Sequence, residues 1–120
     1  DATISTYGGN YRGFVLRPAG GSSAFVIGEG PNSNKQLDFL SPLNEWVHVA
    51  GTYDGSTMKA YVNGNEAASL SGVTAASWEG QSLTIGKANW YNNYFNGLID
   101  SVAIYNRALT PEEIALHANS

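Results

Sequence analysis

The chain has 120 residues, a formal net charge of −4, 42% hydrophobic residues and no cysteine. This length suits one compact domain, and the lack of cysteine excludes disulfides and thiolate metal sites. The basic residues are too scattered to form the clustered positive surface that nucleic acid requires. No apolar run approaches the roughly 20 residues of a membrane-spanning helix, so insertion into a membrane is not expected either.

Short runs of alternating apolar and polar residues, separated by turn residues, predict an all-β antiparallel sandwich. The expected strands, in chain order, are Thr3–Tyr7, Tyr11–Arg17, Ser23–Gly28, Gln36–Phe39, Trp46–Tyr53, Thr57–Asn63, Glu66–Leu70, Ser82–Lys87 and Asn96–Tyr105. The pairs Asp54-Gly55 and Asn63-Gly64 are the strongest turn signals, because type I′ hairpin turns need positive φ angles that these residues tolerate. Residues 46–70 are therefore expected to form a three-stranded meander.

One short helix is expected near the end of the chain, over residues 110–117. Thr110 can cap it, Pro111 suits its first position, and Glu113 completes a capping box. The expected core side chains are Phe14, Leu16, Phe25, Ile27, Trp46, Val49, Val62, Ile85, Val102 and Ile104.

Four stretches together resemble a known family. They are residues 44–55 (NEWVHVAGTYDG), 59–64 (KAYVNG), 83–86 (LTIG) and 95–114 (FNGLIDSVAIYNRALTPEEI). In order and spacing they are similar to the laminin G-like (LamG) members of the concanavalin A-like lectin/glucanase superfamily. The resemblance implies a jelly roll of two curved antiparallel sheets. It also implies a non-catalytic, lectin-like module that binds glycan or polysaccharide in an extracellular or cell-envelope protein.

The chain begins later than members of this family usually do, since they carry further strands before a stretch such as Thr3–Leu16. We therefore expect one domain over residues 1–120 whose usual N-terminal strands are absent, either as a trimmed piece of a longer protein or as a shortened variant. An exposed sheet edge is a template for strand addition. A strand-pairing partner or self-association is expected at that N-terminal edge.

The superfamily includes glucanases, so hydrolysis is the first alternative to binding. A retaining hydrolase needs two carboxyl groups about 5 Å apart on one face, and no three acidic residues here follow the Glu-x-Asp-x-x-Glu pattern of its laminarinase-type members. A Gly-x-Ser-x-Gly elbow is also missing. His48 and His117 are best explained as part of a strand and as a charge near a helix end. We expect no catalytic residues, although the parent protein could still be a glycoside hydrolase.

The candidate sugar-binding residues combine aromatic rings, which stack on the apolar C–H face of a sugar, with amides that bond to hydroxyl groups. They are Asn89, Trp90, Tyr91, Asn92, Asn93 and Tyr94, joined by Asn10 and Tyr11 of a second loop. In the alternative interpretation Trp90 and Phe95 plug the end of the sandwich, the asparagines hold turns, and the second loop is an ordinary Gly-Gly hairpin. The same loops could instead contact a protein in a structural or adhesion module.

Asp100 falls in phase with Leu98, Val102 and Ile104, at a nominally core-facing position. An isolated buried carboxylate is costly and needs partners. It could accept backbone N–H bonds, or it could help to bind Ca²⁺, which takes six to eight oxygen ligands. Calcium sites occur in many proteins of the resembling family, although their other ligands often come from the N-terminal portion. Asp100 is therefore the candidate metal ligand, and no other cofactor is expected.

Overall fold

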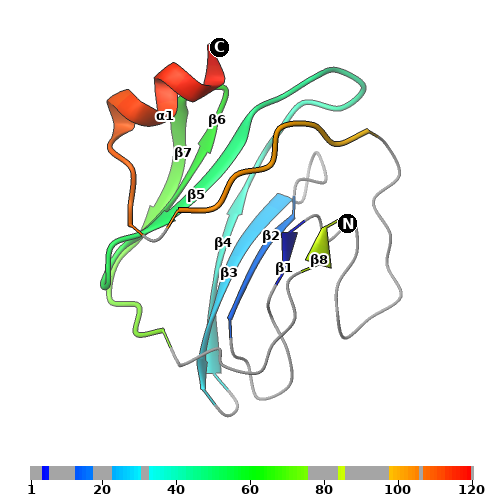
Figure 1. Ribbon diagram of the computed structural model, residues 1–120. Coiled ribbons are helices and arrows are strands. Elements are labelled where there is room, and N and C mark those ends of the chain that lie inside the picture. Colours follow the sequence, from blue (N-terminus) through cyan, green and yellow to red (C-terminus); the bar gives the residue numbers. More distant parts are fainter. Residues whose placement is uncertain are drawn as a thin grey trace.

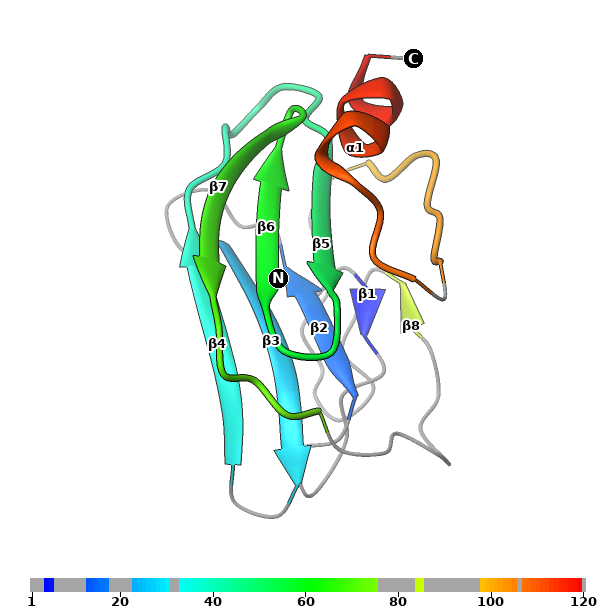
Figure 2. The ribbon, with the colours of Figure 1, turned by 90° about the vertical axis from the view of Figure 1, so that its left-hand side faces the viewer.

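The computed structural model describes residues 4–5, 13–17, 23–30, 33–75, 84–85, 98–105 and 107–119. Two antiparallel sheets face each other as the layers of a sandwich (Figures 1 and 2). The larger sheet has the strand order β4-β3-β2-β1-β8 and the smaller one β5-β6-β7. The predicted all-β antiparallel sandwich is thereby confirmed.

The elements follow the predicted order. The strands of the larger sheet are β1 (Ile4–Ser5), β2 (Phe14–Arg17), β3 (Ser23–Gly30), β4 (Ser33–Phe39) and β8 (Thr84–Ile85). Those of the smaller sheet are β5 (Val49–Tyr53), β6 (Met58–Val62) and β7 (Asn65–Leu70), and the helix is α1 (Pro111–Ala118).

The smaller sheet is the predicted meander. The turn at Asn63-Gly64 forms for the expected reason, because both residues have positive φ angles. Asp54 does not, so the first turn is not of type I′ but a loop over residues 54–57, between the paired residues Tyr53 and Met58. Gly55, Asn63 and Gly64 have φ angles of 105°, 51° and 86°. The Asp54 carboxylate accepts the N–H groups of Thr57 and Ser56 at 2.8 and 3.0 Å. These bonds lower the pKa of Asp54, and the ionised carboxylate in turn stabilises the first turn.

The core lies between the two sheets. The larger sheet contributes Leu16, Phe25, Ile27, Leu37 and Phe39, and the smaller one Met58 and Ala60, with Val73 from the segment after β7. Gly51 of β5 lies so close to the Phe25 ring that a Cβ atom on it would be 3.0 Å from three ring carbons. The absence of a side chain at this position therefore lets the two sheets approach.

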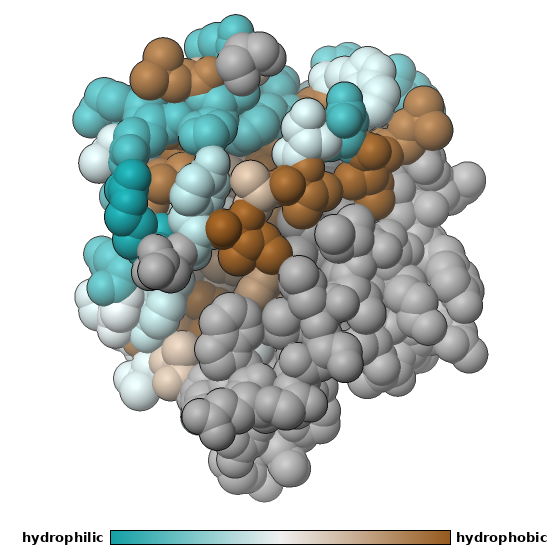
Figure 3. Space-filling view, in the orientation of Figure 1, coloured by the Kyte–Doolittle hydropathy of each residue, from teal (hydrophilic) through white to brown (hydrophobic). Residues whose placement is uncertain are grey.

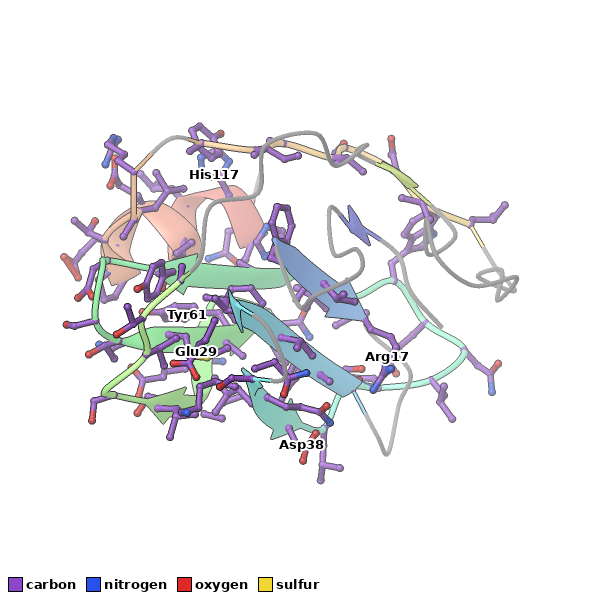
Figure 4. All side chains as sticks on the ribbon, turned by 90° about the horizontal axis from the view of Figure 1, so that it is seen from below. Arg17, Glu29, Asp38, Tyr61 and His117 are labelled. Carbon is purple, nitrogen blue, oxygen red and sulfur yellow. The ribbon has the colours of Figure 1, made fainter. Side chains whose placement is uncertain are left out.

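Hydrogen bonds to the carboxylate of Glu29 link the segment after β7 to the larger sheet. Glu29, on β3, accepts Lys35 Nζ at 2.8 Å, Ser33 Oγ at 2.9 Å and the N–H of Thr74 at 3.0 Å. The bond from Lys35 and that from Thr74 lower the pKa of Glu29 to about 2. Figure 4 shows Glu29 beside this segment. The Glu29 carboxylate therefore connects segments that are distant in the sequence.

The helix forms as predicted, with the complete capping box between Thr110 and Glu113. Arg107 donates to both carboxylate oxygens of Glu113, at 2.9 and 2.7 Å, which anchors the residues entering the helix. A Cβ atom on Gly64 would be 3.3 Å from Ala115 Cα. The helix therefore rests directly on the turn between β6 and β7, at one end of the smaller sheet (Figure 2).

Three predicted core residues and one predicted strand are wrong. Trp46 is 67% exposed, Val102 38% and Ile104 49%, and Ile85 lies in a strand whose side chains fall outside the described part. The expected strand Asn96–Tyr105 is absent from its described portion, residues 98–105. Ser101 has a φ of 56°, which interrupts an extended chain, and no described strand pairs with this segment. Asp100 is consequently exposed rather than core-facing.

Candidate binding surface

The residues that the sequence analysis selected for sugar binding lie outside the described part of the chain. They are Asn89, Trp90, Tyr91, Asn92, Asn93 and Tyr94 in one loop and Asn10 and Tyr11 in the other. Their role stays a prediction. The described residues do present two other exposed features that bear on binding.

The first feature is the loop 40–48, which joins β4 of the larger sheet to β5 of the smaller one. Leu40, Leu43 and Trp46 are 72%, 66% and 67% exposed on it. Asn44, with a φ of 61°, turns the chain just before Trp46, and Asn44 and Glu45 are exposed beside the indole. The loop therefore offers an aromatic ring to solvent with an amide and a carboxylate next to it in the sequence.

The sequence did contain a signal for the exposure of Trp46. Val49 and Tyr53 pack against the core, and successive side chains of a strand point to opposite faces. Trp46 precedes Val49 by an odd number of residues, so an extended chain through both cannot direct both inward. Counting from Val49 would have placed the indole outside the core.

The second feature is the segment 98–105, along which hydrophobic residues form a brown band in Figure 3. Its exposed side chains are Leu98 (79%), Ile99 (37%), Val102 (38%), Ile104 (49%) and Tyr105 (47%). Its last residue is tied to α1, because the Tyr105 hydroxyl lies 3.3 Å from His117 Nε2 and the two rings meet edge to face. Figure 4 shows His117 on the helix close to this segment.

The ionisable groups near these features stabilise the fold. Arg107 lowers the pKa of Glu113 to about 2, as Lys35 does that of Glu29. Burial, and then the nearby His117, lower the pKa of His48, whose buried Nδ1 has no hydrogen-bond partner among the residues that the structure describes. His48 is therefore uncharged at neutral pH. In the described ranges the carboxyl groups with a displaced pKa are Glu29, Asp54 and Glu113, and the pKa of each is lowered, the reverse of what a general acid needs.

A metal centre does not emerge from the part of the chain that the structure describes. No group of three or more His, Cys, Asp or Glu side chains is placed there to hold an ion. Asp100 is exposed and stands without such a group around it, so calcium at this residue stays a prediction. Among the same residues, no helix is both long and apolar enough to cross a membrane.

Comparison with known families and proteins gives consistent results. The sequence profile of the concanavalin A-like lectin/glucanases superfamily matches residues 1–115. Adhesion G-protein coupled receptor D1 is 33% identical in Homo sapiens and 31% identical in Bos taurus, each match covering 94% of this chain. Pappalysin-1 of Mus musculus is 31% identical over 58% of the chain. The chain spans only 14%, 13% and 5% of these three proteins.

Two solved structures share the fold. An S-layer domain-containing protein from Clostridium thermocellum has a TM-score of 0.58 and 26% identity, and the match covers 93% of this chain and 59% of that one. The binding domain of botulinum neurotoxin serotype C1 also has a TM-score of 0.58, with 15% identity, over 98% of this chain and 31% of that one. The second likeness concerns the fold alone.

Proposed function

The chain belongs to the concanavalin A-like lectin/glucanase superfamily, and from this membership we propose that it is a non-catalytic carbohydrate-binding domain of an extracellular or cell-envelope protein. Its relatives include adhesion receptors, and a structural neighbour that is 26% identical is an S-layer domain-containing protein. These names fit recognition of a glycan or a protein outside the cell.

The exposed indole of Trp46 is the observation that carries the proposal. A sugar is held when the flat face of an aromatic ring covers its C–H surface while polar side chains bond to its hydroxyl groups. Trp46 is 67% exposed, and Asn44 and Glu45 next to it are exposed as well. The predicted loop of residues 89–94 would add further rings and amides.

Three carboxyl groups of the described residues are held in a state that suits binding better than hydrolysis. Glu29 and Glu113 are each engaged by a basic side chain and have a pKa of about 2. Asp54 is engaged by its own turn. A glycosidase requires one carboxyl group that stays protonated near its working pH, and these three are held in the opposite state.

A glycan array tests the proposal, with the protein displayed in many copies because single sites of this kind bind weakly. Trp46→Ala is expected to lose binding, whereas the control Leu116→Ala, which removes another exposed apolar side chain, is expected to retain it. Trp90→Ala and Tyr91→Ala test the predicted loop in the same way. Retention of no glycan, or equal binding by Trp46→Ala and Leu116→Ala, would contradict the assignment.

Calcium is tested in the same experiment. If Asp100 ligates Ca²⁺, EDTA and Asp100→Asn should both weaken glycan binding, and added Ca²⁺ should restore it only in the unmodified protein. Binding that is indifferent to EDTA would remove calcium from the proposal and leave the aromatic site intact.

A second candidate function, contact with a protein, is favoured by the amount of exposed apolar surface. Leu40 and Leu43 accompany Trp46 on its loop, and the segment 98–105 adds its own apolar side chains. Large apolar patches mark protein interaction sites more often than sugar sites. The double substitution Leu40→Ser and Leu43→Ser separates the two functions, because it should disrupt a protein contact while sparing a sugar stacked on the indole.

A further inference from the structure

His48, which immediately precedes β5, is bound to the turn on which α1 rests. Its N–H donates to Asn63 Oδ1 at 2.9 Å, and its C=O accepts the N–H of Asn63 at 2.7 Å. Gly64, the next residue of that turn, lies against the helix, because a Cβ atom on it would be 3.3 Å from both Ala115 Cα and Ala118 Cβ. His48 and α1 therefore have one short turn as a common neighbour (Figure 2).

The imidazole of His48 lies where a positive charge is unfavourable. Its Nδ1 is buried, and within the described ranges this atom has no hydrogen-bond partner. Burial lowers the pKa of the ring below its ordinary 6.5, and the charge of His117 lowers it further. Protonation would place an unpaired cation at a buried atom, which is costly. The folded chain therefore favours the neutral form of His48.

A second imidazole, that of His117, comes from the last turn of α1. Its Nε2 lies 3.3 Å from the Tyr105 hydroxyl, and the two ring centroids are 5.7 Å apart. His117 is exposed, so water and protons reach it, and Figure 4 shows it on the helix beside the segment 98–105. Since its charge already acts on His48, protonation of both rings sets two positive charges against each other while α1 is docked.

The other titratable groups on the elements around these two rings do not neutralise a charge on His48. They are Glu45, Lys59, Tyr61, Glu66, Asp100, Tyr105, Arg107, Glu112 and Glu113. Within the described part of the chain, the charge that acts on the pKa of His48 comes from His117 and from none of these groups. Glu66 is paired with Lys59 at 3.5 Å, and Glu113 with Arg107 at 2.7 Å.

We propose that the docking of α1 on the turn of Asn63 and Gly64 is a pH switch: protonation of His48 and His117 releases the helix while the two sheets stay folded. Release uncovers Ile114, which is 2% exposed in the docked helix, and separates His117 from Tyr105. An isolated helix of eight residues is marginal in water, so α1 unwinds once it has left the turn. The domain therefore presents apolar surface at mildly acid pH that it covers at neutral pH.

The direction of the pH dependence follows from which state binds protons more readily. Because the pKa of His48 in the folded chain is below 6.5, the released state takes up its proton first. The docked state is fully favoured above pH 6.5 and loses stability as the pH falls from 6.5 through the lower folded pKa. Glu29 and Glu113, each with a pKa of about 2, become protonated at lower pH. The range from about pH 5 to 6.5 therefore reports on the histidines.

Hydrogen exchange followed by NMR tests the switch, with rates corrected for the intrinsic effect of pH. The N–H groups of Ile114 and Asn119 bond to carbonyls at the two ends of α1. Their protection should fall about three- to tenfold between pH 7.5 and 5.5, the range given by one proton taken up on release. The N–H groups of the central strand β3 should stay protected. Unchanged protection of α1, or equal losses in α1 and β3, would overturn the proposal.

Three variants assign the response to the histidines. His48→Gln and His117→Gln each remove one titrating ring and keep a polar side chain, so both should reduce the pH response of α1. The control Leu116→Gln introduces the same residue at a 74% exposed position of the helix and should keep the full response. If circular dichroism shows that His48→Gln does not fold, the exposed His117 still provides the test. Equal pH responses in His117→Gln and Leu116→Gln would overturn the proposal. The measurement uses no glycan, so failure of the sugar-binding function would not affect it.

Discussion

The substitution Gly51→Ala tests how closely the two sheets approach. Its new Cβ atom would lie 3.0 Å from three carbons of the Phe25 ring, and this ring is only 5% exposed. Because the ring is enclosed by the core, it cannot turn away freely. Overpacking of this kind costs about 1–3 kcal/mol, and replacing a strand glycine by alanine returns about 0.5–1 kcal/mol through lower chain entropy. The midpoints of these two ranges leave a net destabilisation of about 1.25 kcal/mol.

The expected change is measurable by thermal and urea denaturation. Unfolding entropy of about 2.1 cal/mol/K per residue gives about 0.25 kcal/mol/K for this chain, so Tm should fall by about 5 °C. The double variant Gly51→Ala with Phe25→Leu should be less destabilised than the sum of its parts, since a smaller side chain makes room for the methyl group. Unchanged or higher stability in Gly51→Ala, or additive effects in the double variant, would refute the packing of Phe25 on Gly51.

Three further predictions concern single residues that stabilise the fold locally. Gly64→Ala should lower the free energy of unfolding by at least about 1–2 kcal/mol, measured by urea denaturation. The φ of 86° disfavours a side chain, and the new Cβ atom would lie 3.3 Å from Ala115 Cα. An unchanged urea midpoint would contradict the docking of α1 on this turn. Thr110→Ala should cost about 0.5–2 kcal/mol through the lost cap, whereas Thr110→Ser should retain most of it; equal loss in both would argue against capping. Glu29→Gln should destabilise the protein at pH 7, and because the folded pKa of about 2 lies below the ordinary 4.5, the difference between the two proteins should shrink as pH falls from 4.5 towards 2. A difference that is constant over that pH range would exclude ionised Glu29 as the stabilising group.

Local signals in the sequence predicted much of the fold. The Asn63-Gly64 turn and the capping box of Thr110 and Glu113 form as expected. The chain also reverses at Asp54-Gly55, although through a loop over residues 54–57 rather than a type I′ turn. Each depends on backbone angles or bonds within a few residues, so the chemistry that determines it lies inside one short stretch. The apolar pattern of β3 likewise placed Phe25 and Ile27 correctly in the core.

The predictions that failed or were missed concern contacts with a segment distant in the sequence. The apolar alternation of residues 98–105 predicts a strand, yet a strand also requires a second backbone to pair with, and that requirement is invisible in one stretch of sequence. The hydrogen bonds of Glu29 were missed for a related reason. Its partners Lys35 and Thr74 come from different segments, and only the folded chain brings them together.

By itself the sequence determined the class of fold, the family and the local turns and caps, because hydrophobic periodicity and turn chemistry act over a few residues. The tertiary structure decided which faces are covered. It placed the indole of Trp46 outside the core and engaged Glu29 and Glu113 in ion pairs. Exposure and pairing depend on contacts between distant segments, so they follow from the assembled sandwich.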